Sequence, residues 1–123
     1  MAKKILIIED ESALQKTLGD FLGGKGYETI SALNGELGLA LAKEKKPDLV
    51  LLDLILPKIN GFDVLKQLKE DEGTKAIPVI VLTNLEGMAD IDKVIGLGAT
   101  TYLVKTDYKL EDVLNKIKQT LNE

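Results

Sequence analysis

The sequence predicts one α/β domain of the doubly wound type, with five short parallel strands that alternate with five helices. Short apolar runs recur along its 123 residues. Each is too short for a helix and lacks the alternation of a half-exposed strand, which is typical of a parallel sheet covered on both faces. Between the runs, apolar residues are spaced three and four apart, as on one face of a helix. This regular alternation of strand and helix favours a doubly wound sandwich.

Five segments are expected to form the strands. Four of them are continuous apolar runs, and the fifth is more polar and is expected at an edge of the sheet. In chain order the segments are Ile5–Ile8, the polar Glu28–Ala32, Leu49–Leu52, Val79–Leu82 and Tyr102–Val104.

Five helices are expected between and after these strands. The first carries Leu14, Leu18, Phe21 and Leu22 on one face and ends at Gly23-Gly24; the third, begun by Gly61, carries Phe62, Leu65 and Leu68; the fourth carries Ile91, Val94 and Ile95; and the fifth runs from Leu110 to Leu121. The second, around Leu37–Leu41, is ambiguous because its leucines alternate as in a strand. Its alanines, its charged tail and the following Pro47 favour a helix.

Composition excludes several kinds of site. The chain has no cysteine and no histidine, so thiol chemistry, a histidine base and the usual zinc ligands are absent. A metal site would have to consist of oxygen atoms, which favours a hard ion such as Mg²⁺. The net charge of −4 argues against nonspecific binding to nucleic acid or anionic membrane. The N-terminal apolar run is too short for a signal peptide, so we expect a cytoplasmic protein.

A carboxylate stands inside an apolar run at Asp53, in the stretch VLLDLILP. A buried carboxylate is usually paired, metal-bound or neutralised. In open parallel sheets ligands bind at the carboxyl ends of the strands, which right-handed crossovers place on one edge. Polar residues follow three other predicted strands, namely Glu9 and Asp10, Thr83, and Lys105. We therefore expect three carboxylates, one hydroxyl and one ammonium group to meet there.

This group of side chains could bind a metal ion and accept a phosphoryl group. Three carboxylates repel one another unless a positive charge lies among them, and Mg²⁺ suits an oxygen-only site. The Asp53 carboxylate could act as a nucleophile toward a phosphoryl group and form an acyl phosphate. The metal and Lys105 would offset the charge of the phosphoryl oxygens, and Thr83 could donate a hydrogen bond to one of them.

Four motifs make the chain resemble the receiver domain of two-component response regulators. They are ILIIEDE, LLDLILPKINGFDVL, VLTN and YLVKT, and they occur in the order known in that family. The resemblance covers essentially the whole chain, so we expect residues 1–123 to form a single receiver domain with no output domain among them. It implies a flavodoxin-like sheet of order 2-1-3-4-5.

The resemblance also implies a role for each site residue. Asp53 would accept a phosphoryl group from a histidine kinase or phosphotransfer protein. Glu9, Asp10 and Asp53, with the backbone carbonyl of Ile55, would hold Mg²⁺. Thr83 and Lys105 would contact the phosphoryl group.

Phosphorylation would also act at a distance from Asp53. Tyr102 would be a switch aromatic that turns inward when Thr83 moves. The face of the fourth helix, fifth strand and fifth helix would then change its preference for a downstream protein or a second copy of the chain.

Three positions depart from the usual receiver pattern. Glu9 stands where many receivers have Asp, and its longer side chain could reach the metal through a water molecule. Asn84 replaces a small residue and could affect the lifetime of the phosphoryl group. Thr106 replaces a proline after Lys105, so we expect either a trans peptide bond there or a strained cis one.

Two other functions are compatible with parts of the sequence. An aspartyl phosphatase would carry a second acid two residues after its nucleophile, where this chain has Ile55, which cannot act as an acid. A pseudo-receiver would bind proteins without phosphorylation, but it would normally lack a site residue. We expect a domain that catalyses only its own phosphorylation and dephosphorylation, either as a stand-alone protein or as part of a longer one.

Overall fold

The computed structural model describes residues 2–54, 56, 59–83, 88–104 and 109–122. Five parallel strands form one sheet in the order β2-β1-β3-β4-β5. They are β1 (Lys4–Ile8), β2 (Glu28–Ala32), β3 (Leu49–Asp53), β4 (Val79–Thr83) and β5 (Thr101–Val104). The predicted fold class and the edge position of the second strand are therefore confirmed.

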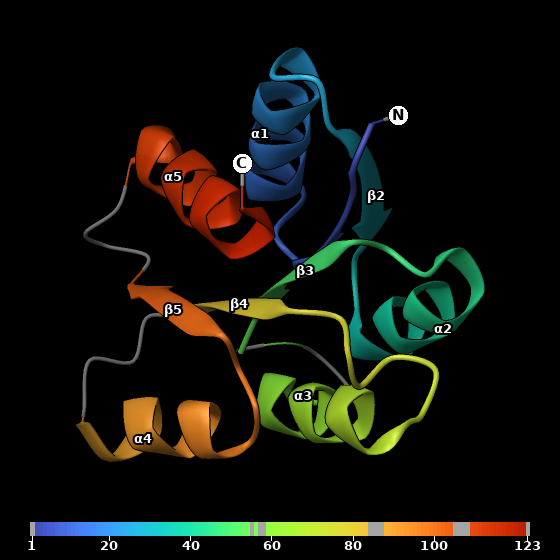
Figure 1. The fold of residues 1–123 in the computed structure, drawn as a ribbon, viewed down its shortest axis with the longest axis vertical. Coiled ribbons are helices and arrows are strands. Elements are labelled where there is room, and N and C mark those ends of the chain that lie inside the picture. The colour runs from blue at the N-terminus through green and yellow to red at the C-terminus, as the bar shows by residue number, and fades with distance from the viewer. Residues whose placement is uncertain (1, 55, 57–58, 84–87, 105–108, 123) are drawn as a thin grey trace.

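Five helices alternate with the strands. They are α1 (Ser12–Gly24), α2 (Gly35–Lys45), α3 (Gly61–Glu70), α4 (Met88–Gly96) and α5 (Leu110–Leu121). Figure 1 shows α1 and α5 on one side of the sheet and α2, α3 and α4 on the other. All five predicted helices are present, and α3 begins at Gly61 as expected.

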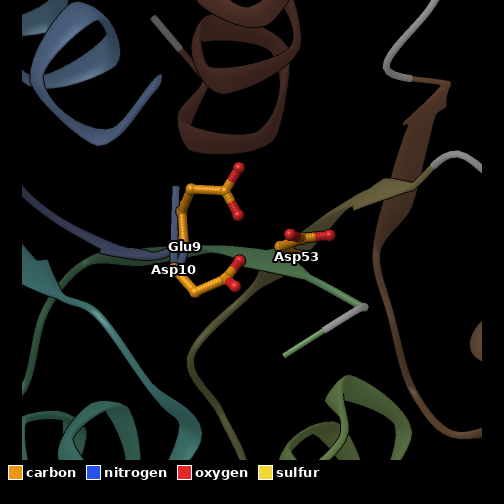
Figure 2. Close-up of side chains that lie close together, drawn as sticks. All are labelled: Glu9, Asp10 and Asp53. Carbon is orange, nitrogen blue, oxygen red and sulfur yellow. The ribbon is translucent and has the colours of Figure 1, made fainter. Parts of the chain in front are cut away.

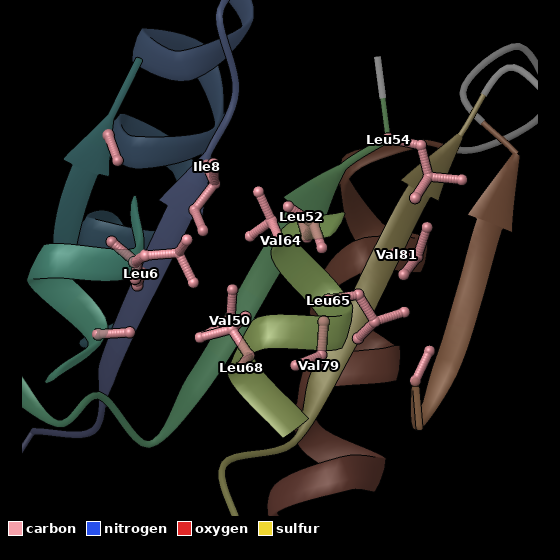
Figure 3. Close-up of a cluster of buried hydrophobic side chains, with 14 of the residues drawn as sticks. Leu6, Ile8, Val50, Leu52, Leu54, Val64, Leu65, Leu68, Val79 and Val81 are labelled. Atoms are coloured by element: carbon pink, nitrogen blue, oxygen red, sulfur yellow. The ribbon is translucent and has the colours of Figure 1, made fainter. Parts of the chain in front are cut away.

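Alternating side chains of the central strands fill two hydrophobic clusters, one on each face of the sheet. Successive side chains of a strand point to opposite faces. In β1, Leu6 and Ile8 therefore join the cluster beneath α2, α3 and α4, as Figure 3 shows in part. Ile5 and Ile7 join the cluster beneath α1 and α5. The central strands β1, β3 and β4 are continuous apolar runs because both of their faces are covered.

The edge strand β5 differs from the other apolar runs. All four of its residues are only half-buried, although their sequence resembles that of the central strands. An edge strand has a neighbour on one side only, and β5 pairs with β4 alone among the described strands.

None of the helices in the described part of the chain has the length and apolar content that a membrane crossing requires.

Candidate functional site

The parallel register of β1 and β3 brings three carboxylates to one edge of the sheet. Ile8, the last residue of β1, lies opposite Leu52 of β3. Glu9 and Asp10 come directly after Ile8, and Asp53 comes directly after Leu52. The end of β1 thus delivers its two acids beside the end of β3.

These three side chains form a compact acidic cluster, drawn in Figure 2. One carboxylate oxygen from each of Glu9, Asp10 and Asp53 lies within 4.8 Å of the other two. Glu9 is fully buried and Asp53 is 3% exposed, whereas Asp10 lies at the surface. The cluster is therefore embedded at the end of the core and open to solvent on the side of Asp10.

The charge of the cluster favours a bound cation. Two unit charges 4–5 Å apart near a protein surface repel by on the order of 3–4 kcal/mol, so a cation among the three carboxylates would turn repulsion into attraction. All candidate donors are oxygen atoms, which are the ligands of hard ions such as Mg²⁺. The exposed position of Asp10 leaves room for the water molecules that Mg²⁺ usually keeps. The residues present therefore fit this ion.

Comparison with known proteins assigns the family. The family model of the response regulator receiver domain matches residues 5–118. The chain belongs to the response regulator receiver family.

The chain is similar in sequence to two named response regulators. The chain is 38% identical over 105 residues to the polar-differentiation response regulator DivK of Brucella anthropi, with 85% of each chain covered. It is 39% identical over 118 residues to the DNA-binding dual master transcriptional regulator RpaA of Synechocystis sp.. That match covers 96% of this chain and 48% of RpaA, so the chain spans about half the length of that relative.

A solved receiver structure has the same fold. The response regulator receiver domain protein (CheY-like) of Methanospirillum hungatei superposes with a TM-score of 0.92 at 27% identity, covering 99% of this chain and 95% of that one. The sheet order expected from the resemblance is thus confirmed both by this likeness and by the strand pairing.

The structure brings together Glu9, Asp10 and Asp53 of the predicted receiver site. Asp53 and Thr83 are the last residues of β3 and β4. Each of these strands is thus one residue longer at its end than expected from the sequence. The side chain of Thr83 lies outside the described part of the chain, and so do the residues Ile55 and Lys105. The two further departures from the receiver pattern, Asn84 and Thr106, also lie outside it.

Tyr102, the predicted switch aromatic, is half-buried in β5 opposite Val81. Its side chain packs against the cluster beneath α2, α3 and α4. This contact accounts for an aromatic residue at the position through packing. The switch role remains a prediction.

One buried polar residue beside the site was not among the predicted residues. Gln15 of α1 is 5% exposed, and its amide nitrogen donates to backbone carbonyl groups of Ile7, Glu9 and Ala32. The predicted face of this helix included only apolar residues. Gln15 lies three residues before Leu18 and seven before Leu22, so helical spacing alone places it on the buried face.

Proposed function

We propose that this receiver domain is a cytoplasmic, phosphorylation-activated switch in which Asp53 accepts a phosphoryl group in the presence of Mg²⁺. The observation that carries the proposal is the cluster of Glu9, Asp10 and Asp53, whose carboxylate oxygens lie within 4.8 Å of one another. Membership of the receiver family supplies the second support. The donor would be a histidine kinase or a phosphotransfer protein.

The carboxylates of the cluster would bind the metal ion. Glu9, Asp10 and Asp53, together with the backbone carbonyl of Ile55, would hold Mg²⁺. The bound ion would offset the negative charge of the phosphoryl oxygens. Glu9 and Asp53 are buried, and the lower dielectric constant of a buried site strengthens electrostatic interactions there.

The transfer step forms one bond and breaks one. An oxygen of the Asp53 carboxylate attacks phosphorus, and the bond between phosphorus and the imidazole nitrogen of the donor breaks. The electron pair of that bond returns to the imidazole, and Asp53 becomes an acyl phosphate. Thr83 and Lys105 would contact the phosphoryl oxygens and so complete the site.

The output would follow from a change in the α4-β5-α5 face. Thr83 would move toward the phosphoryl group, and Tyr102 would turn inward into the space that Thr83 vacates. A downstream protein or a second copy of the chain would then bind this face with altered affinity. The chain would catalyse only its own phosphorylation and dephosphorylation, because Ile55 occupies the position where an aspartyl phosphatase needs an acid.

The proposal is tested by titration with Mg²⁺ and beryllofluoride, a phosphoryl mimic, followed by amide NMR shifts. We expect Mg²⁺-dependent shifts around Asp53 that spread to Tyr102 and α5 in the parent chain. Asp53→Asn should lose the beryllofluoride response. Asp20→Asn, which changes an exposed carboxylate of α1 that pairs with Lys16, should keep it.

Two results would overturn the proposal. An equal beryllofluoride response in Asp53→Asn would exclude Asp53 as the acceptor. Spectra of the parent that stay unchanged on adding Mg²⁺ and beryllofluoride would favour a pseudo-receiver, which binds proteins without phosphorylation.

A further inference from the structure

Gln15 connects helix α1 to two strand ends at once. Its Nε2 atom lies 2.9 Å from the carbonyl oxygen of Ile7, 3.1 Å from that of Ala32 and 3.3 Å from that of Glu9. Ile7 lies near the end of β1, Glu9 directly follows that strand, and Ala32 is the last residue of β2. An amide nitrogen has two hydrogens, so the three carbonyl groups share two donors.

The backbone of Glu9 is held on both sides by this arrangement. Its N–H group donates to the carbonyl of Ala32 at 3.0 Å, and its own carbonyl accepts from Gln15. The carbonyl of Ala32 thus accepts from both Glu9 and Gln15. Because the carbonyl of Glu9 belongs to the peptide group that joins it to Asp10, the orientation of both acids depends on these bonds.

Filling of space does not account for a glutamine at this position. An apolar side chain of similar length would occupy the same volume without burying an amide. The Oε1 atom of Gln15 is buried and accepts no hydrogen bond from any described residue, which costs free energy. The gain must therefore come from the three bonds that Nε2 donates.

We infer that Gln15 is a positioning residue of the acidic site: its amide fixes the backbone of Glu9 and Asp10 so that both carboxylates are preset to hold a divalent cation beside Asp53. The inference rests on the proposed function, since it assigns Gln15 a part in the same metal site. Gln15 contacts neither the expected ion nor the phosphoryl group, and it acts through Glu9 and Asp10.

The test compares the parent with Gln15→Met, which keeps the volume and removes the donors. In the protein without metal, we expect hydrogen exchange of the Glu9 amide to be at least about tenfold faster, because its bond to Ala32 loses support. The Mg²⁺ dissociation constant, from amide NMR shifts, should rise about tenfold, at the lower end of what outer partners of metal ligands contribute. Gln15→Asn, whose stem is shorter, should change both quantities in the same direction and replaces Gln15→Met if that variant does not fold.

Leu22→Val is the matched control, because Leu22 is fully buried on the same helix and lies in the cluster beneath α1 and α5. It should lower the urea midpoint while Mg²⁺ affinity stays within about twofold of the parent. Equal Mg²⁺ affinity in Gln15→Met and Leu22→Val would overturn the inference and leave the proposed function intact. A parent chain without any Mg²⁺-dependent shift would overturn the proposed function, and this inference with it.

Discussion

Gly61, the first residue of α3, lies directly against the backbone of Asp53 and Leu54. A β-carbon at this position would lie 2.6 Å from the carbonyl oxygen of Asp53 and would also press on the α-carbon of Leu54. The N–H group of Gly61 donates to the carbonyl of Leu54 at 2.8 Å. The atoms in the way belong to the backbone, so a larger residue must displace the segment that presents Asp53.

Gly61→Ala is therefore expected to lower the free energy of unfolding by about 1–3 kcal/mol, the usual range for an overpacked site. Urea unfolding measures the loss, and the amide shifts of Asp53 and Leu54 should change with it. Gly23→Ala is the control, since a β-carbon there would have no described atom within 4 Å apart from its chain neighbours and the nearby backbone of α1. Alanine replaces glycine in the last turn of α1, which should raise the free energy of unfolding by about 0.5–1 kcal/mol. Equal effects in the two variants would contradict this account.

At the scale of single residues, the sequence predicts the acids but misses the side chain that supports them. Glu9, Asp10 and Asp53 could be found because each stands at the end of an apolar run, and parallel strands end on one edge. Helical spacing places Gln15 on the buried face, but a buried amide needs partners, and the carbonyl groups of Ile7, Glu9 and Ala32 that accept from it come together only in the folded chain. Polar residues on a helical face are ordinarily assigned to solvent.

Helix α2 shows why an apolar pattern can mislead at the scale of one element. Its leucines alternate like those of a strand, yet it is a helix as predicted. The buried face consists mainly of small residues, Gly35, Gly38 and Ala42, together with Leu39. A β-carbon on Gly38 would lie 2.8 Å from Cγ1 of Ile8, so the helix contacts the sheet through its backbone. Leu37 is 43% exposed, so this apolar residue lies off the buried face and obscures the helical spacing in the sequence.

The connection between α3 and β4 is held by buried and exposed hydrogen bonds. Asp71 accepts from the N–H group of Gly73 and lies 3.4 Å from the ammonium of Lys43, and these contacts lower the pKa of Asp71, the bond from Gly73 most of all. Thr74 is 1% exposed, and its hydroxyl donates to the carbonyl of Leu68 at 2.7 Å. The last turn of α3 is thus closed by a side chain from the loop that follows it.

Thr74→Val should lower the free energy of unfolding by about 1–3 kcal/mol, because the carbonyl of Leu68 keeps its burial and loses a partner. Thr120→Val removes a hydroxyl with the same bond length, 2.7 Å to the carbonyl of Lys116, at a site that is only partly buried. Water can replace that bond, so the loss should be below about 0.5 kcal/mol. Urea unfolding of the two variants compares the losses directly. Equal losses would mean that burial of the bond between Thr74 and Leu68 does not increase its contribution to the free energy of unfolding.

At the scale of the whole molecule, the layers could be predicted and the strand order could not. Continuous apolar strands require helices on both faces, and the clusters on the two faces confirm this. Several strand orders obey right-handed crossovers, so the order 2-1-3-4-5 came from the resemblance to receivers. The half-burial of β5 follows from its edge position, which the sequence alone does not fix.

Under the proposed function, binding of Mg²⁺ should stabilise the whole molecule, because the three carboxylates meet only where the strand ends are assembled. At ten times its dissociation constant, the expected gain in free energy of unfolding is about 1.4 kcal/mol. Asp10→Asn should lose most of this gain, and without metal it should unfold no more easily than the parent, since it relieves repulsion among the three acids. Urea unfolding with and without Mg²⁺ measures both quantities. Asp20→Asn should keep the full gain, and a full gain in Asp10→Asn would exclude Asp10 as a ligand.

Asp53 ends the central strand of the sheet, between β1 and β4, with a packed cluster above and below it. Such a strand has no free side toward which it could shift if its last residue were phosphorylated as we propose. A change of backbone shape would therefore have to occur outside β3. We expect the hydrogen-bond ladder of the sheet to be the same before and after the proposed phosphorylation, so that the response inside the sheet is limited to side-chain movements such as that of Tyr102.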